Sequence, residues 1–568
     1  MKQARLKSKI LKVSTLAFIS VLLATPPSNA DALPDEQFSI ITSNNFQSGQ
    51  ELQGLLIEDN YAYSNMVSYL NSVEDPSNYA KSTHDCVNDS NNSCSINLLR
   101  KYVAILPPCS MTITIDCIDG ISATDSKGKA TQGVLVRNMP IQGFTDFPGD
   151  SSNNLPTGST PSLWSIPGVV NGGSTTQYLI NFRTEGYAKP GESRFSLSDY
   201  SANIFPVSLS ATGSYTLPKH LDSTSGFDQI NGPQGPLADY CAGFEQQDCA
   251  LKQAFPSNYT FKLSARLSQS PTGWFQGRLQ TPNVELTQAA QGYSLQISAL
   301  PVKVPVVGVL QKYSSLAPEL QTFYANKSQE YWGNAGPNGR LNGLSTPPPN
   351  SDDAFSQFAM WSGYINDKAS ATPTEWNFST LQTNGQTNEC LSDSKNFIGI
   401  VTTNSMMFAG GPPSFDSTSG TLNYHVGSPH YSSNGDVFKG TYDLQMNSTV
   451  AKCLYGFSNA PIRATVSITD SSGNNDVATT VVGQSNGWLK MAAYGFTFSD
   501  PTIHVKMTQE SAPQGLSPSK TSSSPVSTTT GNHSALVQQT SKTISCQKGT
   551  LRKKFTTKQC PTGFKLTK

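Results

Sequence analysis

The sequence is poor in the patterns by which enzymes and membrane proteins are recognised. No GxSxG elbow marks a serine hydrolase, no CxxC pair or closely spaced His–Cys set marks a metal site, and no acidic turn fits the twelve-residue calcium loop. After residue 30, no stretch has the roughly 20 consecutive apolar residues that cross a bilayer. We therefore expect no cofactor, no metal site and no transmembrane segment after signal cleavage, and the sequence favours a non-catalytic protein.

The nearest approach to a hydrolase motif is Asp150-Ser151, with His84 upstream. Ser152 stands where a Gly-Asp-Ser nucleophile motif has glycine, so an ordinary turn is the favoured interpretation. His425 and His430 are five residues apart, which on a strand places them on opposite faces. We expect surface histidines there.

Charged residues are scarce as well, at 14% of the chain, whereas Gly, Pro, Ser, Thr and Asn abound. This composition is typical of loop-rich β proteins. We predict a mainly β, multidomain protein with β-sandwich-like domains and few short helices.

The first 30 residues have the pattern of a secretory signal peptide. Basic side chains precede an apolar run from Val13 to Ala24, and small residues then lead to Ala30, after which we expect cleavage. The expected location is extracellular, either secreted or associated with the cell wall.

Ten cysteines in a secreted chain predict five disulfides. Their spacing groups them as Cys86, Cys94, Cys109 and Cys117; Cys241 and Cys249; Cys390 and Cys453; and Cys546 and Cys560.

The pairing within the first group depends on the segment Met111–Ile115, which has the pattern of a strand. Eight extended residues would hold Cys109 and Cys117 about 26 Å apart, whereas a disulfide needs Cα atoms within about 7 Å. If the strand forms, these two cysteines bond elsewhere, for example with Cys94 and Cys86, and the connectivity of the four is left open.

Hydrophobic periodicity divides the rest of the chain. Period-two alternation at Tyr259–Leu267 and Arg463–Asp470 predicts half-buried strands. Tyr313–Trp332 is the best helical candidate, and a short helix is expected around Gly54–Leu70. The predicted parts are an N-terminal disulfide-containing domain (31–147), a β domain (163–311), a helical and loop connection (312–351), a β-sandwich-like domain (352–509), a Ser/Thr/Pro-rich linker (510–541) and a basic disulfide-clasped tail (542–568).

The charge is distributed unevenly between these parts. Residues 31–541 hold 26 basic and 39 acidic side chains, a net charge of −13, whereas the last 27 residues hold eight basic and no acidic ones. The alternatives for the tail are a solvated terminus and a contact for an anionic polymer. The candidate contact residues are Lys548, Arg552, Lys553, Lys554 and Lys558, and no nucleic-acid partner is expected in the extracellular space.

Aromatic residues suggest a second kind of site. Trp332, Trp361 and Trp376 cluster in a polar, loop-rich part of the sequence. Exposed aromatic rings stack on sugar faces, while buried ones fill cores. Burial is the favoured interpretation, and glycan contact is the alternative.

The terminal pattern resembles a short module found on secreted actinobacterial proteins. It reads Ile544-Ser-Cys546-Gln-Lys548-Gly549, then a basic run, then Cys560-Pro-Thr-Gly563-Phe-Lys565. The stretches Cys453–Ile462 and Asn486–Lys490 also resemble large uncharacterised proteins of that kind. The resemblance implies a bacterial, secreted protein, and it implies no activity and no site residues.

Two functions remain open at the level of sequence. The first is a non-catalytic extracellular or surface-associated protein, serving adhesion, a structural layer or ligand binding, whose basic tail contacts anionic envelope polymers. The second is a secreted carbohydrate-binding or polysaccharide-hydrolysing protein. The oligomeric state is not predicted.

Overall fold

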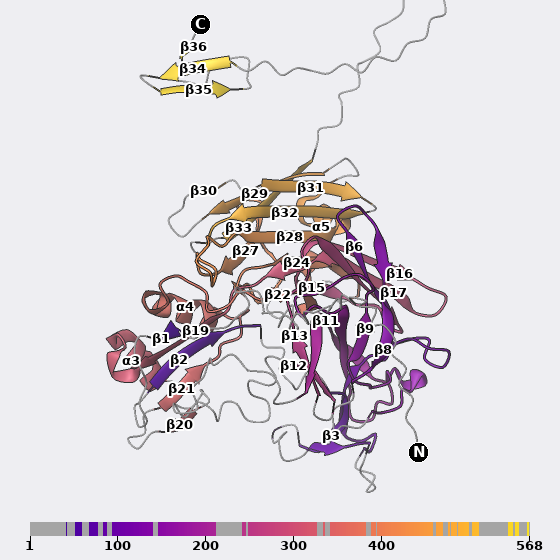
Figure 1. The fold of residues 1–568 in the computed structure, drawn as a ribbon. Helices are drawn as coiled ribbons and strands as arrows, with labels where there is room; N and C mark the ends of the chain where they lie inside the picture. Colours follow the sequence, from indigo (N-terminus) through magenta and orange to yellow (C-terminus); the bar gives the residue numbers. More distant parts are fainter. Residues whose placement is uncertain are drawn as a thin grey trace, which may run out of the picture. The chain divides into compact units, whose positions relative to one another are not determined.

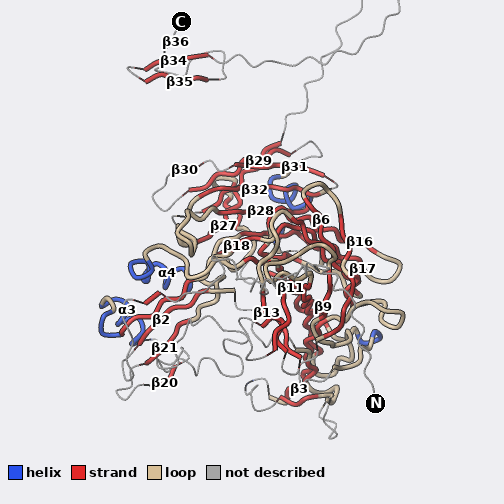
Figure 2. Tube along the Cα trace, in the orientation of Figure 1, coloured by secondary structure: helices blue, strands red, loops and turns tan. Residues whose placement is uncertain are grey.

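A computed structural model describes residues 41–42, 52–59, 67–75, 77, 83–87, 94–139, 146–211, 241–245, 248–326, 333–335, 341–381, 388–392, 395–457, 462–469, 475–476, 479–485, 487–498, 502–509, 544–548, 551–555 and 565–566 (Figure 1). The chain forms two compact units, residues 1–511 and 512–568, which we call the body and the tail and describe separately. Strands predominate and helices are few (Figure 2). The prediction of a mainly β fold is confirmed.

A fifteen-stranded sheet, which we call the central sheet, runs through the body. Its path is β31 (Thr479–Ser485), β32 (Trp488–Phe496), β28 (Gly440–Asn447), β24 (Phe397–Thr403), β15 (Gly273–Arg278), β23 (Asn377–Leu381), β11 (Ser196–Ala211), β10 (Gln177–Ala188), β5 (Leu99–Ile105), β3 (Tyr69–Val73) and β4 (Thr83–Asp85). β9 (Ser162–Ser165) pairs with β10 and with β8 (Val134–Asn138), while β13 (Asp248–Lys252) pairs with β11 and with β12 (Cys241–Glu245).

A five-stranded sheet packs against one face of the central sheet. It consists of β16 (Gln280–Gln288), β17 (Tyr293–Leu300), β14 (Tyr259–Leu267), β6 (Cys117–Asp125) and β7 (Ala130–Gln132). The predicted strand Tyr259–Leu267 is confirmed, because its alternate residues Phe261, Leu263, Ala265 and Leu267 are buried. They share one core with Phe182, Ala202 and Phe378 of the central sheet, so the two sheets form a sandwich.

A second sandwich lies at the C-terminal end of the body. Its outer sheet is formed by β25 (Met407–Phe408), β27 (Thr421–Gly427), β33 (Thr502–Gln509), β29 (Ile462–Thr469) and β30 (Asn475–Asp476), with β26 (Ser414–Asp416) beside β27. Val466 and Ile468 of β29 share a core with Leu444 and Met491 of the central sheet. The predicted strand Arg463–Asp470 is confirmed by β29. After β30 the chain crosses to the opposite sheet of the sandwich, where β31 pairs with β32.

A smaller layer joins N-terminal and middle segments. It contains β1 (Ile41–Thr42), β19 (Val307–Lys312), β2 (Leu52–Ile57), β21 (Leu341–Ser345) and β20 (Gly333–Ala335), with α3 (Pro318–Asn326) and α4 (Asp352–Ile365) beside β2 and β19 (Figure 1). The helical prediction for Tyr313–Trp332 is confirmed in part by α3. The helix expected around Gly54–Leu70 is wrong at its start, where β2 stands and pairs with β19 on one side and β21 on the other.

The strand predicted at Met111–Ile115 is absent from this part of the structure, and Cys109 and Cys117 are bonded to each other. The segment turns back on itself, since the Ser110 amide donates to the Ile113 carbonyl and Asp116 adopts a left-handed conformation (φ 51°). The Cα atoms of the two cysteines are therefore 4.9 Å apart. The suggested pairing of Cys109 and Cys117 with Cys94 and Cys86 is wrong, because Cys86 bonds Cys94.

The later cysteines follow their predicted groups where the structure describes them. Cys390 and Cys453 form a disulfide that joins the 3₁₀ helix η8 (Glu389–Leu391) to α5 (Ser448–Tyr455). β12 and β13 close the Cys241–Cys249 segment into a hairpin, whose cysteine side chains lie outside the described set.

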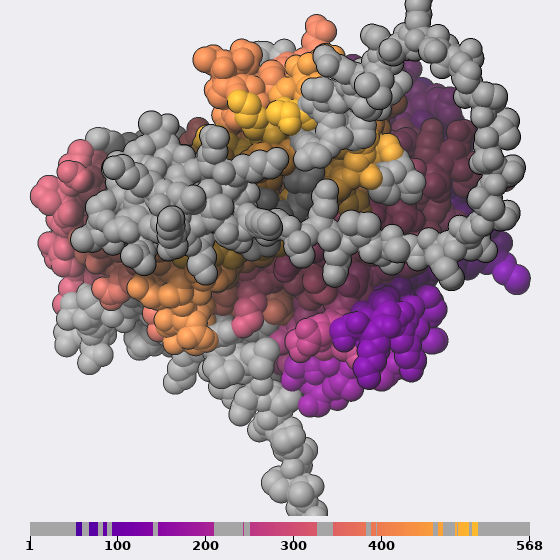
Figure 3. All heavy atoms as spheres, turned by 90° about the horizontal axis from the view of Figure 1, so that it is seen from above, coloured from indigo at the N-terminus to yellow at the C-terminus, as the bar shows by residue number. Residues whose placement is uncertain are grey.

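The predicted domain boundaries inside the body do not separate the sheets. The central sheet takes strands from the ranges 31–147, 163–311 and 352–509. Figure 3 shows the orange residues of the last strands of the body lying against darker magenta residues from the middle of the chain.

Candidate functional site

The tail contains a three-stranded antiparallel sheet. β34 (Ile544–Lys548) and β35 (Leu551–Phe555) form a hairpin in which Lys548 stands opposite Leu551. β36 (Lys565–Leu566) pairs with the other edge of β34. Arg552, Lys553 and Lys554 follow one another along β35, so four of the five candidate polyanion contacts lie in paired strands. Lys558 and Cys560 lie outside the described residues, and the Cys546–Cys560 clasp stays a prediction.

Two of the three tryptophans proposed for glycan contact are in the core. Trp361 is 0% exposed, and its indole N–H donates to the Tyr324 hydroxyl at 2.8 Å. Trp376 is 1% exposed and donates to the Ala299 carbonyl at 3.1 Å. Neither ring has a free face to stack on a sugar, so these two residues do not form a glycan platform. Trp332 lies outside the described residues.

Asp150 and Ser151 form a turn, as the sequence favoured. The 3₁₀ helix η4 (Ser151–Asn153) begins after Asp150, whose carboxylate caps it by accepting from the Ser152 amide at 3.0 Å. Hydrogen bonds from the Ser152 hydroxyl and the Asn153 side-chain amide to its carboxylate hold the pKa of Asp150 below its usual range. The Nε2 atom of His84 lies 3.3 Å from the Glu74 carboxylate.

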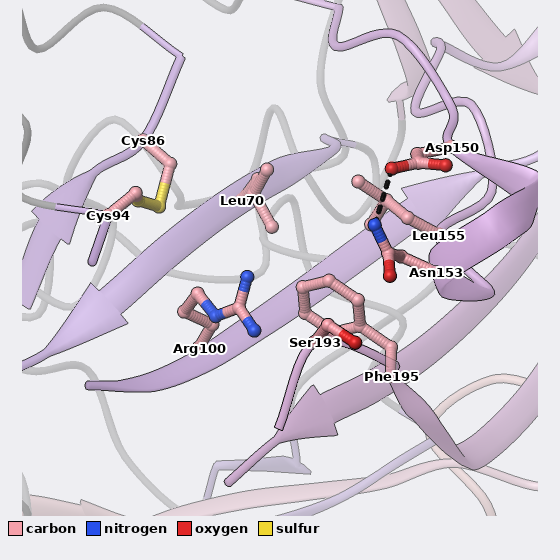
Figure 4. A pocket seen from close by; sticks show the side chains of 9 residues that line it. All are labelled: Leu70, Cys86, Cys94, Arg100, Asp150, Asn153, Leu155, Ser193 and Phe195. Carbon is pink, nitrogen blue, oxygen red and sulfur yellow. Dashed lines mark hydrogen bonds between the residues drawn. A yellow bond between two sulfur atoms is a disulfide. The ribbon is translucent and has the colours of Figure 1, made fainter. Parts of the chain in front are cut away.

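A small hollow lies beside this turn (Figure 4). The Cys86–Cys94 disulfide and Arg100 form one side of it, and Asp150, Asn153 and Phe195 line it as well. The Arg100 guanidinium lies 5.2 Å from the centre of the Phe195 ring and donates to the Glu192 carbonyl. Its charge is therefore already engaged by neighbouring groups.

The two C-terminal histidines lie in different settings. His425 stacks on Phe355 of α4, with ring centres 4.2 Å apart. The His430 imidazole, after the end of β27, contacts the Asp367 carboxylate. Both histidine side chains are half-buried.

The most unusual feature of the body is a set of polar side chains on the face of the central sheet that lies opposite its core with the five-stranded sheet. In antiparallel pairs, directly opposed residues share a face. One row across four strands is Asn181, Asn203, Asn377 and Arg278, the next row is Arg183, Ser201, Ser379 and Gln276, and Glu185 stands opposite Asp199 in a third. We call these ten residues the polar face.

The first row of the polar face is deeply buried. Asn181 and Asn377 are 3% exposed, Asn203 is 4% exposed and Arg278 is 1% exposed. Apolar residues adjoin the rows on the same face, with Leu179 and Phe205 at one side and Trp274 and Leu381 at the other. This site was not predicted from the sequence. Its only local signal is the polar half of the alternation in β10, which is normally taken as the side that meets water.

The third row holds two carboxyl groups. Burial and the neighbouring Glu185 carboxylate raise the pKa of Asp199 to about 6, although a hydrogen bond with Thr380 and the charge of Arg183 act in the opposite direction. Arg183 pairs with Glu185 at 2.6 Å. This end of the polar face therefore combines one cation with two acidic groups.

Arg278 at the other end is fully engaged. Its Nε and Nη2 bind both carboxylate oxygens of Asp59, Nη1 donates to the carbonyl oxygens of Thr403 and Ser405, and Nη2 also donates to that of Met406. The guanidinium lies 4.5 Å from the centre of the Phe408 ring. Arg278 therefore joins the end of β2 to the central sheet and to the loop after β24.

A second polar network lies where β16 meets the central sheet. Asp443 of β28 is 6% exposed and accepts hydrogen bonds from the Tyr494 hydroxyl at 2.5 Å and the Thr281 amide at 3.3 Å. Burial raises the pKa of Asp443 to about 7. Lys490 on the neighbouring strand donates to Asn283 at 2.6 Å. The network joins the two sheets of the first sandwich at their edge.

The described residues contain no group of three or more His, Cys, Asp or Glu side chains placed to hold a metal ion. In the same part of the chain, no helix has the length and apolar character that crossing a membrane requires.

In comparisons with protein-family models, with curated proteins and with solved structures, the chain matches none.

Proposed function

We propose that the protein is a secreted, non-catalytic surface-associated protein whose tail binds an anionic polymer of the cell envelope. The observation that carries the proposal is the tail itself. It holds eight basic and no acidic side chains, and its backbone pairs into a small sheet within a unit of its own. Pairing places Lys548, Arg552, Lys553 and Lys554 on two adjacent strands, which concentrates positive charge along a short length of backbone.

The cysteines support an extracellular location. Disulfides persist in oxidising compartments and are rare in the cytosol of ordinary mesophiles. The pairs Cys86–Cys94, Cys109–Cys117 and Cys390–Cys453 are at bonding distance in the body. Together with the signal-like first 30 residues, they favour export before folding is complete.

The test is a change of four charges in the tail. In the full-length protein, Lys548, Arg552, Lys553 and Lys554 are replaced by glutamine, and wall-bound and medium fractions are compared at about 50 mM and about 500 mM salt. We expect the wild-type protein to leave the wall at high salt, because the Debye length shortens from roughly 14 Å to roughly 4 Å. The variant should be found in the medium at both salt concentrations.

A matched control separates the tail from net charge in general. Lys127, Lys129, Lys189 and Lys506 are exposed residues of the body, and their replacement by glutamine removes the same four charges. This control should stay bound at low salt. The proposal is overturned if the tail variant partitions like the wild type, or if the body variant is released equally.

A further inference from the structure

Three buried side chains of the polar face have polar atoms without a partner. Among the described residues, Asn203 Oδ1, Asn377 Oδ1 and Gln276 Nε2 have no hydrogen bond, although the three residues are only 4%, 3% and 5% exposed. Buried polar atoms are nearly always paired, because desolvation without a compensating bond is costly. The three lie on one face of adjacent strands β11, β23 and β15.

Another buried asparagine of the body shows the usual arrangement. Asn171 is 5% exposed, and its amide nitrogen donates to the carbonyl oxygens of Gln177 and Val207 at 2.9 and 3.1 Å. Its Oδ1 accepts from the Gly173 amide at 2.9 Å. The unpaired atoms of the polar face are therefore a property of that face and not of buried amides in this protein generally.

Exposure increases along the polar face towards its carboxylate end. On β10, Asn181 is 3% exposed, while the side chains of Arg183 and Glu185 are 18% and 31% exposed. The amide end thus forms a buried floor, and the half-buried end with Arg183, Glu185 and Asp199 meets solvent.

The chemistry of the floor selects one class of ligand. Its free atoms are two acceptors and one donor, all of them on uncharged amides. A hydroxyl group both donates and accepts at a single oxygen, so several hydroxyls on one molecule can satisfy this mixture, whichever way round each amide is placed. None of these free atoms carries a charge that would pair with an ion, and Arg183 at the exposed end already pairs with Glu185 at 2.6 Å. A neutral molecule with several hydroxyls needs no charged partner in the floor.

We propose that the polar face of the body binds a neutral polyhydroxylated ligand of the chemical class of a sugar unit, with Asn203, Asn377 and Gln276 as its contacts. This site uses none of the three tryptophans of the sequence prediction. It is also independent of the tail, since every residue belongs to the body.

The experiment uses the full-length protein on an array of neutral and charged glycans, followed by calorimetric titration with the best neutral ligand. Asn203→Leu and Gln276→Met remove the free amide atoms at nearly constant volume. We expect each substitution to raise the Kd at least tenfold. Because no protein partner is lost in either case, neither should lower Tm, whereas Asn171→Leu, the control for the thermal measurement, should lower it clearly.

The outcomes distinguish ligand binding at the polar face from ordered water at the same place and from polymer binding by the tail. If the wild-type protein binds no neutral glycan, the floor holds ordered water only and the proposal is overturned. It is equally overturned if Asn203→Leu and Gln276→Met bind like the wild type. Should one of them fail to fold, the other decides. The four-glutamine tail variant should keep the wild-type Kd for the neutral glycan, so failure of the proposed tail function leaves this result unaffected.

Discussion

Asp443 shows how a single residue couples the sandwich to pH. It stands on β28 with its carboxyl group turned to β16, and it faces the Tyr494 hydroxyl, the Thr281 amide and the ammonium group of Lys490. Burial outweighs these partners and raises its pKa to about 7 from an ordinary value of 3.8. Between these two pH values the native state retains a proton that the unfolded chain has released.

We predict that Asp443→Asn removes a pH-dependent loss of stability. Because the pKa of Asp443 is higher in the folded protein than in the unfolded chain, its contribution to the free energy of unfolding is fully present below about pH 4 and is lost as the pH rises towards 7. The free energy of unfolding changes over this range by at most about 1.4 kcal/mol per pH unit. Urea denaturation at pH 5 and pH 8 checks this. The free energy of unfolding of the variant should rise relative to that of the wild type between pH 5 and pH 8. The same difference between the two proteins at both pH values would contradict the raised pKa of Asp443.

At the scale of elements, the disulfides differ most in the length of chain that they close. Cys390 and Cys453 are 63 residues apart and join η8 to α5, whereas Cys109 and Cys117 are eight apart and close a single turn. In the chain-entropy account, a longer loop restricts the unfolded chain more. The long bridge should therefore contribute more to the free energy of unfolding.

Replacing both cysteines of each pair by serine tests this order. The chain-entropy model gives a loss of about 4 kcal/mol for the Cys390–Cys453 pair and about 2.5 kcal/mol for the Cys109–Cys117 pair. Denaturant titration of the two double variants under non-reducing conditions measures the difference. A larger loss for the short bridge would indicate that local strain, and not loop closure, governs their contributions.

The elements also show where local pattern is a reliable guide. Tyr259–Leu267 and Arg463–Asp470 were predictable because alternate apolar residues define a buried side whatever strand lies next to them. α4 was missed, although Ser351 caps it and Asp352 and Asp353 occupy its first turn. Met111–Ile115 has a strand pattern, but a left-handed Asp116 and the Cys109–Cys117 bond fold it into a turn.

For the whole molecule, Arg278 joins segments that are far apart in the sequence. It ties Asp59 after β2 to β15 and to three carbonyl groups after β24. The side chain is 1% exposed, so its loss would leave a buried carboxylate without its cation. The smaller layer and the central sheet are held together partly by this residue.

We predict that Arg278→Met lowers the free energy of unfolding by about 3–5 kcal/mol. Asp59→Asn should cost less, because the guanidinium keeps its carbonyl partners. Arg266→Met is the matched control. Its ion pair with Asp119 is 47% and 41% exposed, and such pairs contribute about 1 kcal/mol or less.

Denaturant titration of the three variants checks the order, and hydrogen exchange should show faster opening of Leu52–Ile57 in Arg278→Met alone. Equal losses for Arg278→Met and Arg266→Met would show that the buried contacts do not hold the layers together.

The sequence by itself determined the mainly β class, the strands Tyr259–Leu267 and Arg463–Asp470 and the basic character of the tail. These features depend on composition and on short-range alternation, which are local properties of the chain. The pairing of Cys390 with Cys453 was also predictable, because the other cysteines of the body already fall into two groups of closely spaced residues.

Only the tertiary structure decided which strands are neighbours and what covers their second face. Asn181, Asn203, Gln276 and Asn377 come from segments up to 196 residues apart, and only sheet pairing brings them into adjoining rows. The burial of Trp361 and Trp376 was decided in the same way. Local sequence encodes which side of a strand is apolar, whereas the partner that buries the other side is fixed by long-range packing.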